Sequence, residues 1–221
     1  FQHRVSIDMP TGIDASTGKM IGKCFRPHAT ITFIALKIGQ LINQGKIYSG
    51  DIVLQTLDVK MKNDIEPIAE ILTVQNIRSL LPKRKKDAHK GSHGKLLIVA
   101  GDEGYGGAGT LTSETAMKTG TGLVKLLTRE RYVAPNLARN PEIMVLGGDN
   151  AQDLESQFPW ADIFVCGPGM FQNYWSEQLL YKLIEYAQLN HIPTLLDAGA
   201  LRLLSMEVFA ELALPENLII T

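Results

Sequence analysis

The chain has few cysteines, little net charge and no long apolar run, and each of these absences excludes a class of protein. Its 221 residues include two cysteines, Cys24 and Cys166, which lie far apart and outside any CxxC pair. This usage predicts reduced thiols, as in a cytoplasmic protein, and neither a disulfide framework nor a zinc site. A formal net charge of −1 provides no attraction for nucleic acid or an anionic membrane. No apolar run approaches membrane-spanning length, and no signal-peptide pattern opens the chain.

An initiator methionine and a polar C-terminal segment are missing as well. The chain starts at Phe1 and stops within the apolar residues 218–221, which resemble a strand without its following loop. We therefore expect a fragment of a longer protein. In a parallel sheet, a strand at 218–221 would form an exposed edge that can pair with another chain.

The most distinctive stretch present is a short apolar run followed by many glycines. Residues 96–100 have the length and composition of a buried strand, and a segment with helical potential ends at Gly120, a suitable C-cap. Strand, glycine loop and helix together direct unpaired backbone N–H groups toward an anion. The stretch thus predicts a phosphate or nucleotide site, and a turn without a ligand is the alternative. The glycines of the loop are Gly101, Gly104, Gly106, Gly107 and Gly109.

Residues 104–109 also match the dinucleotide-binding pattern GxGxxG, but they lie too late in the loop. In a Rossmann fingerprint the first glycine closes the strand, and here Gly101 occupies that place. A Walker A loop is excluded because no Gly-Lys-Ser/Thr follows. An ordinary NAD-dependent dehydrogenase is therefore disfavoured.

Two residues near the N-terminus form a candidate polar site. Asp8 ends a predicted strand at 5–8, and Thr11 lies on the sharp turn that follows. Their oxygen atoms suit an alkali or alkaline-earth cation or a sugar hydroxyl. The alternative is a capped turn in which both side chains bond to local N–H groups.

Two later predicted strands are also followed directly by glycine or aspartate. Gly167 and Gly169 follow the predicted strand 163–166, and Asp197 follows the strand 194–196. Because open parallel sheets bind ligands at the carboxyl ends of their strands, we expect one crevice lined by these residues and the glycine loop. An ordinary turn at Gly167 remains the alternative. Lys90 would add positive charge to the anion site, or it faces solvent.

The order of the remaining segments predicts an α/β protein. Further strands are expected at 29–34, 51–56 and 123–128, and helices at 40–47, 74–81, 174–189 and 201–206. Strands and helices alternate from residue 95 onward, which indicates a mostly parallel sheet with helical crossovers. Residues 60–67 are polar and without periodicity, as expected of a linker.

Several short motifs resemble a known family when they are taken in order. Together they are similar to the dehydratase domain of bifunctional NAD(P)H-hydrate repair enzymes, which has a ribokinase-like α/β fold. The segments Asp8-Met-Pro-Thr-Gly12 and 32–37 resemble the last third of the Rossmann-like epimerase domain of the same proteins. We expect the epimerase part at 1–59, a linker at 60–73 and the dehydratase part at 74–221. The dehydratase motifs lie at 81–84, 88–95, 100–109, 140–145, 166–169 and 196–201.

The resemblance implies a metabolite-repair enzyme that is both an isomerase and a lyase. The epimerase interconverts the R and S hydrates of NADH and NADPH, and the dehydratase removes water from the S hydrate with ADP or ATP and Mg²⁺. Asp8 corresponds to a residue that contacts the hydrate, and Thr11 to a ligand of K⁺. From their places in the sequence, and not from the resemblance, Lys90 and Asp197 are candidates for the nucleotide phosphates, and Asp197 is also a possible ligand of a metal ion or a hydroxyl group. A homo-oligomer is expected. The residues implied at the dehydratase substrate site are Gly107, Ala108, Gly167 and Gly169.

The resemblance leaves the catalytic residue of the dehydratase unassigned. The aspartate that would serve as its general base is expected beyond Thr221. Two alternative functions remain: a ribokinase-like kinase of a small molecule such as a vitamin precursor, and a non-enzymatic binding module with an epimerase-like fold. The upstream segment 8–12 disfavours the kinase, because simple kinases lack such a partner domain.

Overall fold

The computed structural model describes residues 3–59, 66–81 and 83–221. They belong to two compact units, Phe1–Pro82 and Lys83–Thr221, which we describe separately. Residues 60–65 of the predicted linker 60–73 lie outside the described residues. Residues 74–81, assigned by sequence to the dehydratase part, are grouped with the first unit. The assignment of the two functional domains remains a prediction.

The first unit contains a three-stranded parallel sheet in the order β1-β2-β3. Its strands, β1 (Val5–Ile7), β2 (Ala29–Phe33) and β3 (Asp51–Gln55), confirm the three that the sequence predicts. The helix expected at 40–47 is divided into a 3₁₀ turn, η1 (Ile38–Gln40), and α1 (Asn43–Tyr48). The division lies at Ile42, whose backbone is extended with φ of −120° and ψ of 163°, and the next residue, Asn43, is left-handed with φ of 48°. Helix α2 (Val74–Leu80) matches its prediction.

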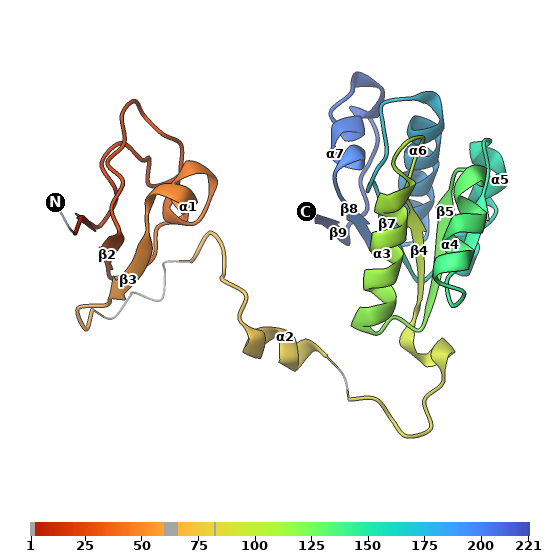
Figure 1. The fold of residues 1–221 in the computed structure, drawn as a ribbon, viewed down its shortest axis with the longest axis horizontal. Coiled ribbons are helices and arrows are strands. Elements are labelled where there is room, and N and C mark those ends of the chain that lie inside the picture. The colour runs from red at the N-terminus through yellow and green to blue at the C-terminus, as the bar shows by residue number, and fades with distance from the viewer. Residues whose placement is uncertain (1–2, 60–65, 82) are drawn as a thin grey trace. The chain divides into compact units, whose positions relative to one another are not determined.

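The second unit is a six-stranded parallel sheet with helices on both faces (Figure 1). The predicted alternation of strands and helices is confirmed, and β6, α4 and α5 are additional elements that we did not predict. The strands are β4 (Lys95–Val99), β5 (Leu123–Thr128), β6 (Met144–Gly147), β7 (Ile163–Cys166), β8 (Thr194–Leu196) and β9 (Leu218–Ile220). The helices are α3 (Gly106–Thr119), α4 (Val133–Arg139), α5 (Ala151–Glu155), α6 (Tyr174–Leu189) and α7 (Gly199–Leu204), and the 3₁₀ turns are η2 (Lys90–His93), η3 (Glu130–Tyr132), η4 (Phe158–Trp160) and η5 (Glu207–Phe209).

The order of the strands, β6-β5-β4-β7-β8-β9, reverses at one point. The chain proceeds from β4 to β5 and β6, and then returns to β7 on the other side of β4. Right-handed crossovers therefore place α3 and α4 on one face and α5, α6 and α7 on the other. The pair β4–β7 is the switch point at which open α/β sheets bind ligands. Strand β9 is an edge strand, as predicted.

Two apolar cores fill the two faces of this sheet. Successive residues of β4 point to opposite sides, so Leu97 and Val99 join the larger core with α6, whereas Ile98 joins the smaller core beneath α3. Helix α3 ends as predicted, because Gly120 adopts the left-handed conformation with φ of 108°. In the parts of the chain that the structure describes, no helix is both long enough and apolar enough to cross a membrane.

Candidate functional site

The loops after β4 and β7 are fastened to each other at the carboxyl edge of the sheet. The N–H of Gly101 donates to the carbonyl oxygen of Pro168 over 2.9 Å, and the N–H of Asp102 donates to that of Gly169 over 2.9 Å. These bonds continue the ladder between β4 and β7 beyond the strands themselves. The two glycine-containing loops that the sequence places in one crevice are therefore neighbours.

Ala108, in the first turn of α3, packs directly against Gly169. Gly169 has φ of +68°, and a Cβ on it would lie 2.7 Å from the Cβ of Ala108 and 2.8 Å from the carbonyl oxygen of Tyr105. Only glycine fits this position without a shift of the neighbouring loop. Gly107 is exposed, and a Cβ on it would meet no atom within 4 Å. Gly107 therefore borders open space beside the contact between Ala108 and Gly169.

Gly167 and Asp197 meet at the ends of β7 and β8, whereas Lys90 lies elsewhere. Gly167 is buried with φ of +123°, and a side chain on it would overlap the carbonyl oxygen of Asp197. The carboxylate of Asp197 is partly exposed and accepts a 2.7 Å hydrogen bond from the N–H of Ala198. Lys90 is exposed in η2, before β4 begins, and its carbonyl oxygen adjoins Gly122, before β5. The structure thus places Lys90 at the amino edge of the sheet, away from the glycine loops.

The glycine loop offers fewer free N–H groups than its sequence suggests. The N–H of Glu103 donates to Oδ1 of Asp102 over 2.7 Å, and the N–H of Gly104 donates to the hydroxyl of Tyr132 over 2.7 Å. At a helix start, the N–H of Gly107 has no acceptor within the helix. Anion binding at this loop would therefore depend on Gly107 rather than on a row of unpaired amides.

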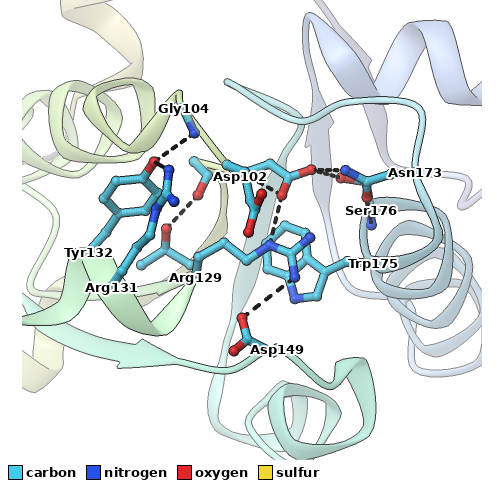
Figure 2. A network of polar contacts seen from close by, with 12 residues as sticks. Asp102, Gly104, Arg129, Arg131, Tyr132, Asp149, Asn173, Trp175 and Ser176 are labelled. Carbon is cyan, nitrogen blue, oxygen red and sulfur yellow. Dashed lines mark hydrogen bonds and ion pairs between the residues drawn. The ribbon is translucent and has the colours of Figure 1, made fainter.

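A buried carboxylate that the sequence analysis missed connects the loops of the carboxyl edge (Figure 2). The side chain of Asp102 is 0% exposed. Its Oδ1 accepts a hydrogen bond from Nε of Arg129 over 2.7 Å, and its Oδ2 accepts one from Oγ of Ser176 over 3.0 Å and another from the side-chain amide of Asn173. The guanidinium of Arg129 lies 4.3 Å from the ring centre of Trp175.

The hydrogen bonds keep Asp102 ionised despite its burial. Burial raises the pKa of this carboxyl, but the bonds from Arg129, the Glu103 N–H, Asn173 and Ser176 outweigh that effect and lower the pKa below its ordinary value. Arg129 is also 3.6 Å from the carboxylate of Asp149, whose side chain is 78% exposed. A buried ion pair with this many partners is satisfied on both sides, so the charge is tolerated in the interior.

In the first unit, Asp8 forms an ion pair with Lys37 at the end of β1. Oδ1 of Asp8 accepts hydrogen bonds from Nζ of Lys37, from the hydroxyl of Thr32 over 3.0 Å and from the N–H of Phe33 over 3.3 Å. The hydrogen bond from Lys37 is the main reason that the pKa of Asp8 is lowered. Sequence reasoning selected Asp8 but missed Lys37, which was visible only as the last residue of the motif 32–37.

Thr11 is exposed on the turn after Asp8, and its carbonyl oxygen accepts a hydrogen bond from the N–H of Phe25 over 3.0 Å. Among residues 3–59, 66–81 and 83–221, no group of three or more His, Cys, Asp or Glu side chains could hold a metal ion. A hard cation near Thr11 or Asp197 would therefore need oxygen ligands from the backbone, from water or from a substrate.

Two surface hollows lie away from these residues. One, of about 290 Å³, is bordered by the last turns of α3 and the loop before β6, and it includes Glu114. The other, of about 660 Å³, is bordered by α5 and α6. Neither hollow is lined by a residue that the sequence analysis assigns to a site. The volume of a hollow therefore does not indicate where the candidate site lies.

Comparison with known proteins supports the arrangement found in the structure. The family model described as NAD(P)H-hydrate dehydratase matches residues 96–221, which is more than half of the chain. The model described as YjeF-related protein N-terminus matches residues 2–39. The two matches fall in the order that the sequence motifs predict.

The chain is similar to bifunctional NAD(P)H-hydrate repair enzymes. It is 37% identical to that of Leishmania major over an alignment of 218 positions, which covers 91% of this chain and 38% of the relative. It is 36% identical to that of Escherichia coli (strain K12) over 205 residues, again 91% and 38%. The chain thus spans less than half the length of these relatives.

Two solved structures share the predicted fold. One is a ribokinase-like superfamily protein from Enterococcus faecalis V583, with 28% identity, a TM-score of 0.57 and coverage of 62% of this chain and 48% of that one. The other is the ADP/ATP-dependent NAD(P)H-hydrate dehydratase of Bacillus subtilis, co-crystallised with ATP and Mg²⁺, with 27% identity, a TM-score of 0.50 and coverage of 58% and 46%. These likenesses confirm the ribokinase-like α/β fold, and the chain belongs to the NAD(P)H-hydrate dehydratase family.

Proposed function

We propose that the protein repairs hydrated NADH and NADPH, with nucleotide-dependent dehydration in the second unit and epimerisation of the R and S hydrates in the first. The observation that carries the proposal is the packing of Ala108 on Gly169 at the strand-order reversal, within the segment matched by the dehydratase model. A simple kinase would not account for the epimerase-related segment 2–39 upstream.

The dehydration needs a good leaving group on the nicotinamide ring. Transfer of the terminal phosphoryl group of ATP or ADP to the ring hydroxyl releases ADP or AMP and the hydroxyl proton, and phosphate then replaces hydroxide as the leaving group. The C–O bond then breaks as a base takes a proton from the neighbouring carbon, and the reduced ring is restored. In this proposal Gly107, Ala108, Gly167 and Gly169 border the hydrate, and the general base is assigned to no described residue.

Asp197 is our candidate for holding Mg²⁺ together with the nucleotide. Its partly exposed carboxylate has one oxygen bonded to the N–H of Ala198. Mg²⁺ is commonly bound by one or two carboxylates and the phosphates of a substrate, so a single carboxylate at this edge fits such an ion. Lys90, at the opposite edge, would reach phosphates only from outside this crevice.

For the epimerase part, we propose that Asp8 contacts the hydrate and that Thr11 contributes an oxygen to K⁺. Lys37 supports the first role because its ammonium keeps the Asp8 carboxylate ionised. Thr11→Val should make epimerisation by the full-length protein less dependent on K⁺, since the change keeps the shape and deletes the oxygen. Ser16→Ala, on the exposed turn that follows at residues 15–17, is the control. A K⁺ response equal to wild type in Thr11→Val would exclude the hydroxyl as a ligand. A homo-oligomer without nucleic acid remains our expectation.

The dehydratase proposal is tested with the full-length protein and the S hydrate. With ATP or ADP and Mg²⁺, absorbance at the reduced-nicotinamide band should recover. Ala108→Phe should abolish this recovery while the protein stays folded, because the ring would fill the space beside Gly169. Leu111→Phe, at a position 62% exposed farther along α3, should keep the activity. Normal turnover by folded Ala108→Phe would refute the placement, and no recovery by wild type with either nucleotide would refute the function.

A further inference from the structure

We infer that Asp102 is a positioning residue of the substrate site. Its buried carboxylate connects the loop after β4, which leads to Gly107 and Ala108 in α3, to the loop after β7, which contains Gly169. The inference rests on the proposed function only in naming the ligand of that site. The geometry of the two loops is independent of it.

Asp102 is hydrogen-bonded at three places to the β7–α6 loop and the first turn of α6. Its N–H donates to the carbonyl oxygen of Gly169 over 2.9 Å, and its Oδ2 accepts from Oγ of Ser176 over 3.0 Å and from the side-chain amide of Asn173. Asn173 is also the N-cap of α6, since its Oδ1 accepts from the N–H of Ser176 over 3.0 Å. One carboxylate therefore fixes both the start of α6 and the loop before it.

The other carboxylate oxygen connects two further strands. Oδ1 accepts from Nε of Arg129, which directly follows β5, and the guanidinium of Arg129 stacks on Trp175 in the first turn of α6. Nε1 of Trp175 in turn donates to the carbonyl oxygen of Gly148, directly after β6, over 2.9 Å. The ends of β4, β5 and β7 are thus joined through the side chain of Asp102, which is 0% exposed, and the end of β6 is added through Trp175 (Figure 2).

This network fixes the orientation of the loops more than it stabilises the fold. A buried ion pair contributes little to folding compared with apolar residues of the same size, and the sheet below already has an apolar core. Charge-assisted hydrogen bonds, by contrast, fix the orientation of the groups that they join. Because Asp102 holds Gly169 by its own N–H, a small movement of Asp102 would alter the contact between Gly169 and Ala108.

Asp102→Asn in the full-length protein tests the inference. The change preserves size but replaces an acceptor oxygen with an NH₂ group, which must face either the Arg129 donor or the Ser176 and Asn173 donors. We expect the KM for the S hydrate to rise at least tenfold with kcat changed less than threefold, because a displaced wall weakens binding in the ground and transition states alike. A purely structural defect would instead lower the active fraction, and hence kcat, at constant KM.

Hydrogen exchange provides a readout that does not need the activity. Asp102→Asn should accelerate amide exchange in residues 103–108 and 168–176. The matched control is Asp149→Asn, which faces the same guanidinium at 3.6 Å but is 78% exposed, and it should stay within twofold of wild type in KM and exchange. A folded Asp102→Asn protein with wild-type KM and wild-type exchange would overturn the inference.

A second variant, Ser176→Ala, and the exchange measurement cover the cases in which Asp102→Asn does not fold or wild type lacks activity. If Asp102→Asn does not fold, Ser176→Ala removes a single 3.0 Å hydrogen bond to the same carboxylate and should accelerate exchange in 168–173. Unchanged exchange in Ser176→Ala would then overturn the inference. If wild type lacks dehydratase activity, the proposed function fails, and the exchange comparison alone decides whether Asp102 positions the loops.

Discussion

Replacing Gly107 by alanine separates the stability of the fold from contact with a substrate. Gly107 is the second residue of α3, is exposed and has helical backbone geometry. A Cβ at this position would meet no protein atom within 4 Å, so Gly107→Ala introduces no clash. The methyl group would instead enter the open space beside the contact between Ala108 and Gly169. If a hydrated nicotinamide ring binds there, the methyl group meets the ligand and not the protein.

The expected effects on stability and on binding have opposite signs. Alanine is favoured over glycine in a helix by roughly 0.5–1 kcal/mol, which for a domain of this size corresponds to a rise in Tm of about 1–4 °C. Against the substrate, a methyl group in a fitted pocket typically changes binding by about 1–3 kcal/mol. We therefore expect the KM of the S hydrate to increase by roughly tenfold or more.

The assay combines a thermal melt with dehydratase kinetics on the full-length protein. Gly104→Ala is the control for the melt, because its Cβ would also meet no atom within 4 Å but its φ is +79°. That variant should lose about 1–2 kcal/mol to backbone strain, so its Tm should fall. A Gly107→Ala protein with raised Tm and unchanged KM would remove Gly107 from the substrate site. A lowered Tm would refute the geometric reasoning itself.

Three other variants test separate parts of the structure. Gly169→Ala should destabilise the protein by about 2–5 kcal/mol in urea unfolding, because strain at φ +68° adds to a 2.7 Å contact with Ala108; wild-type stability would contradict this. Lys37→Met should raise the pKa of Asp8 in an NMR titration, and an unchanged pKa would show that the ion pair is not formed in solution. Glu114 has its pKa lowered from 4.5 to about 2 by hydrogen bonds from an arginine and an asparagine. The contribution of the Glu114 carboxylate to the free energy of unfolding is complete above pH 4.5 and is lost as the pH falls toward 2. The difference in stability between wild type and Glu114→Gln should therefore shrink over that interval. A constant difference would contradict the reasoning.

The fold could be predicted from sequence wherever a single local signal was strong. The apolar run before Gly101 formed β4, and the apolar period of residues 174–189 formed α6. Helix α4 was missed because Pro135 stands within its seven residues, and proline ordinarily marks the end of a helix. Strand β6 was missed because it ends in Gly147, and glycine is depleted in strands, so the run gives a weaker strand signal than β7 of the same length.

The gathering of the glycine-containing loops at one carboxyl edge was also predictable, but the bonding within and between them was not. The sequence suggested that the glycine loop presents several free amides to an anion. In the structure, the N–H of Gly104 donates to Tyr132, 28 positions away, and the carboxylate of Asp102 accepts from Ser176, 74 positions away. Such partners depend on which strands are neighbours. Strand order follows from tertiary packing, so a local pattern cannot supply them.

The Asp102–Arg129 pair shows that one long-range contact did leave a sequence signal. In β4 and β5, Val99 pairs with Leu127, so Asp102 and Arg129 follow paired positions by three and two residues. Consecutive strands joined by one helix are usually neighbours in a parallel sheet, and their carboxyl ends then lie at the same edge. Opposite charges that directly follow two consecutive apolar strands are thus expected to meet. Because that edge is also where ligands bind, a charged pair in this pattern indicates a polar network that organises a site, even where no catalytic motif contains either residue.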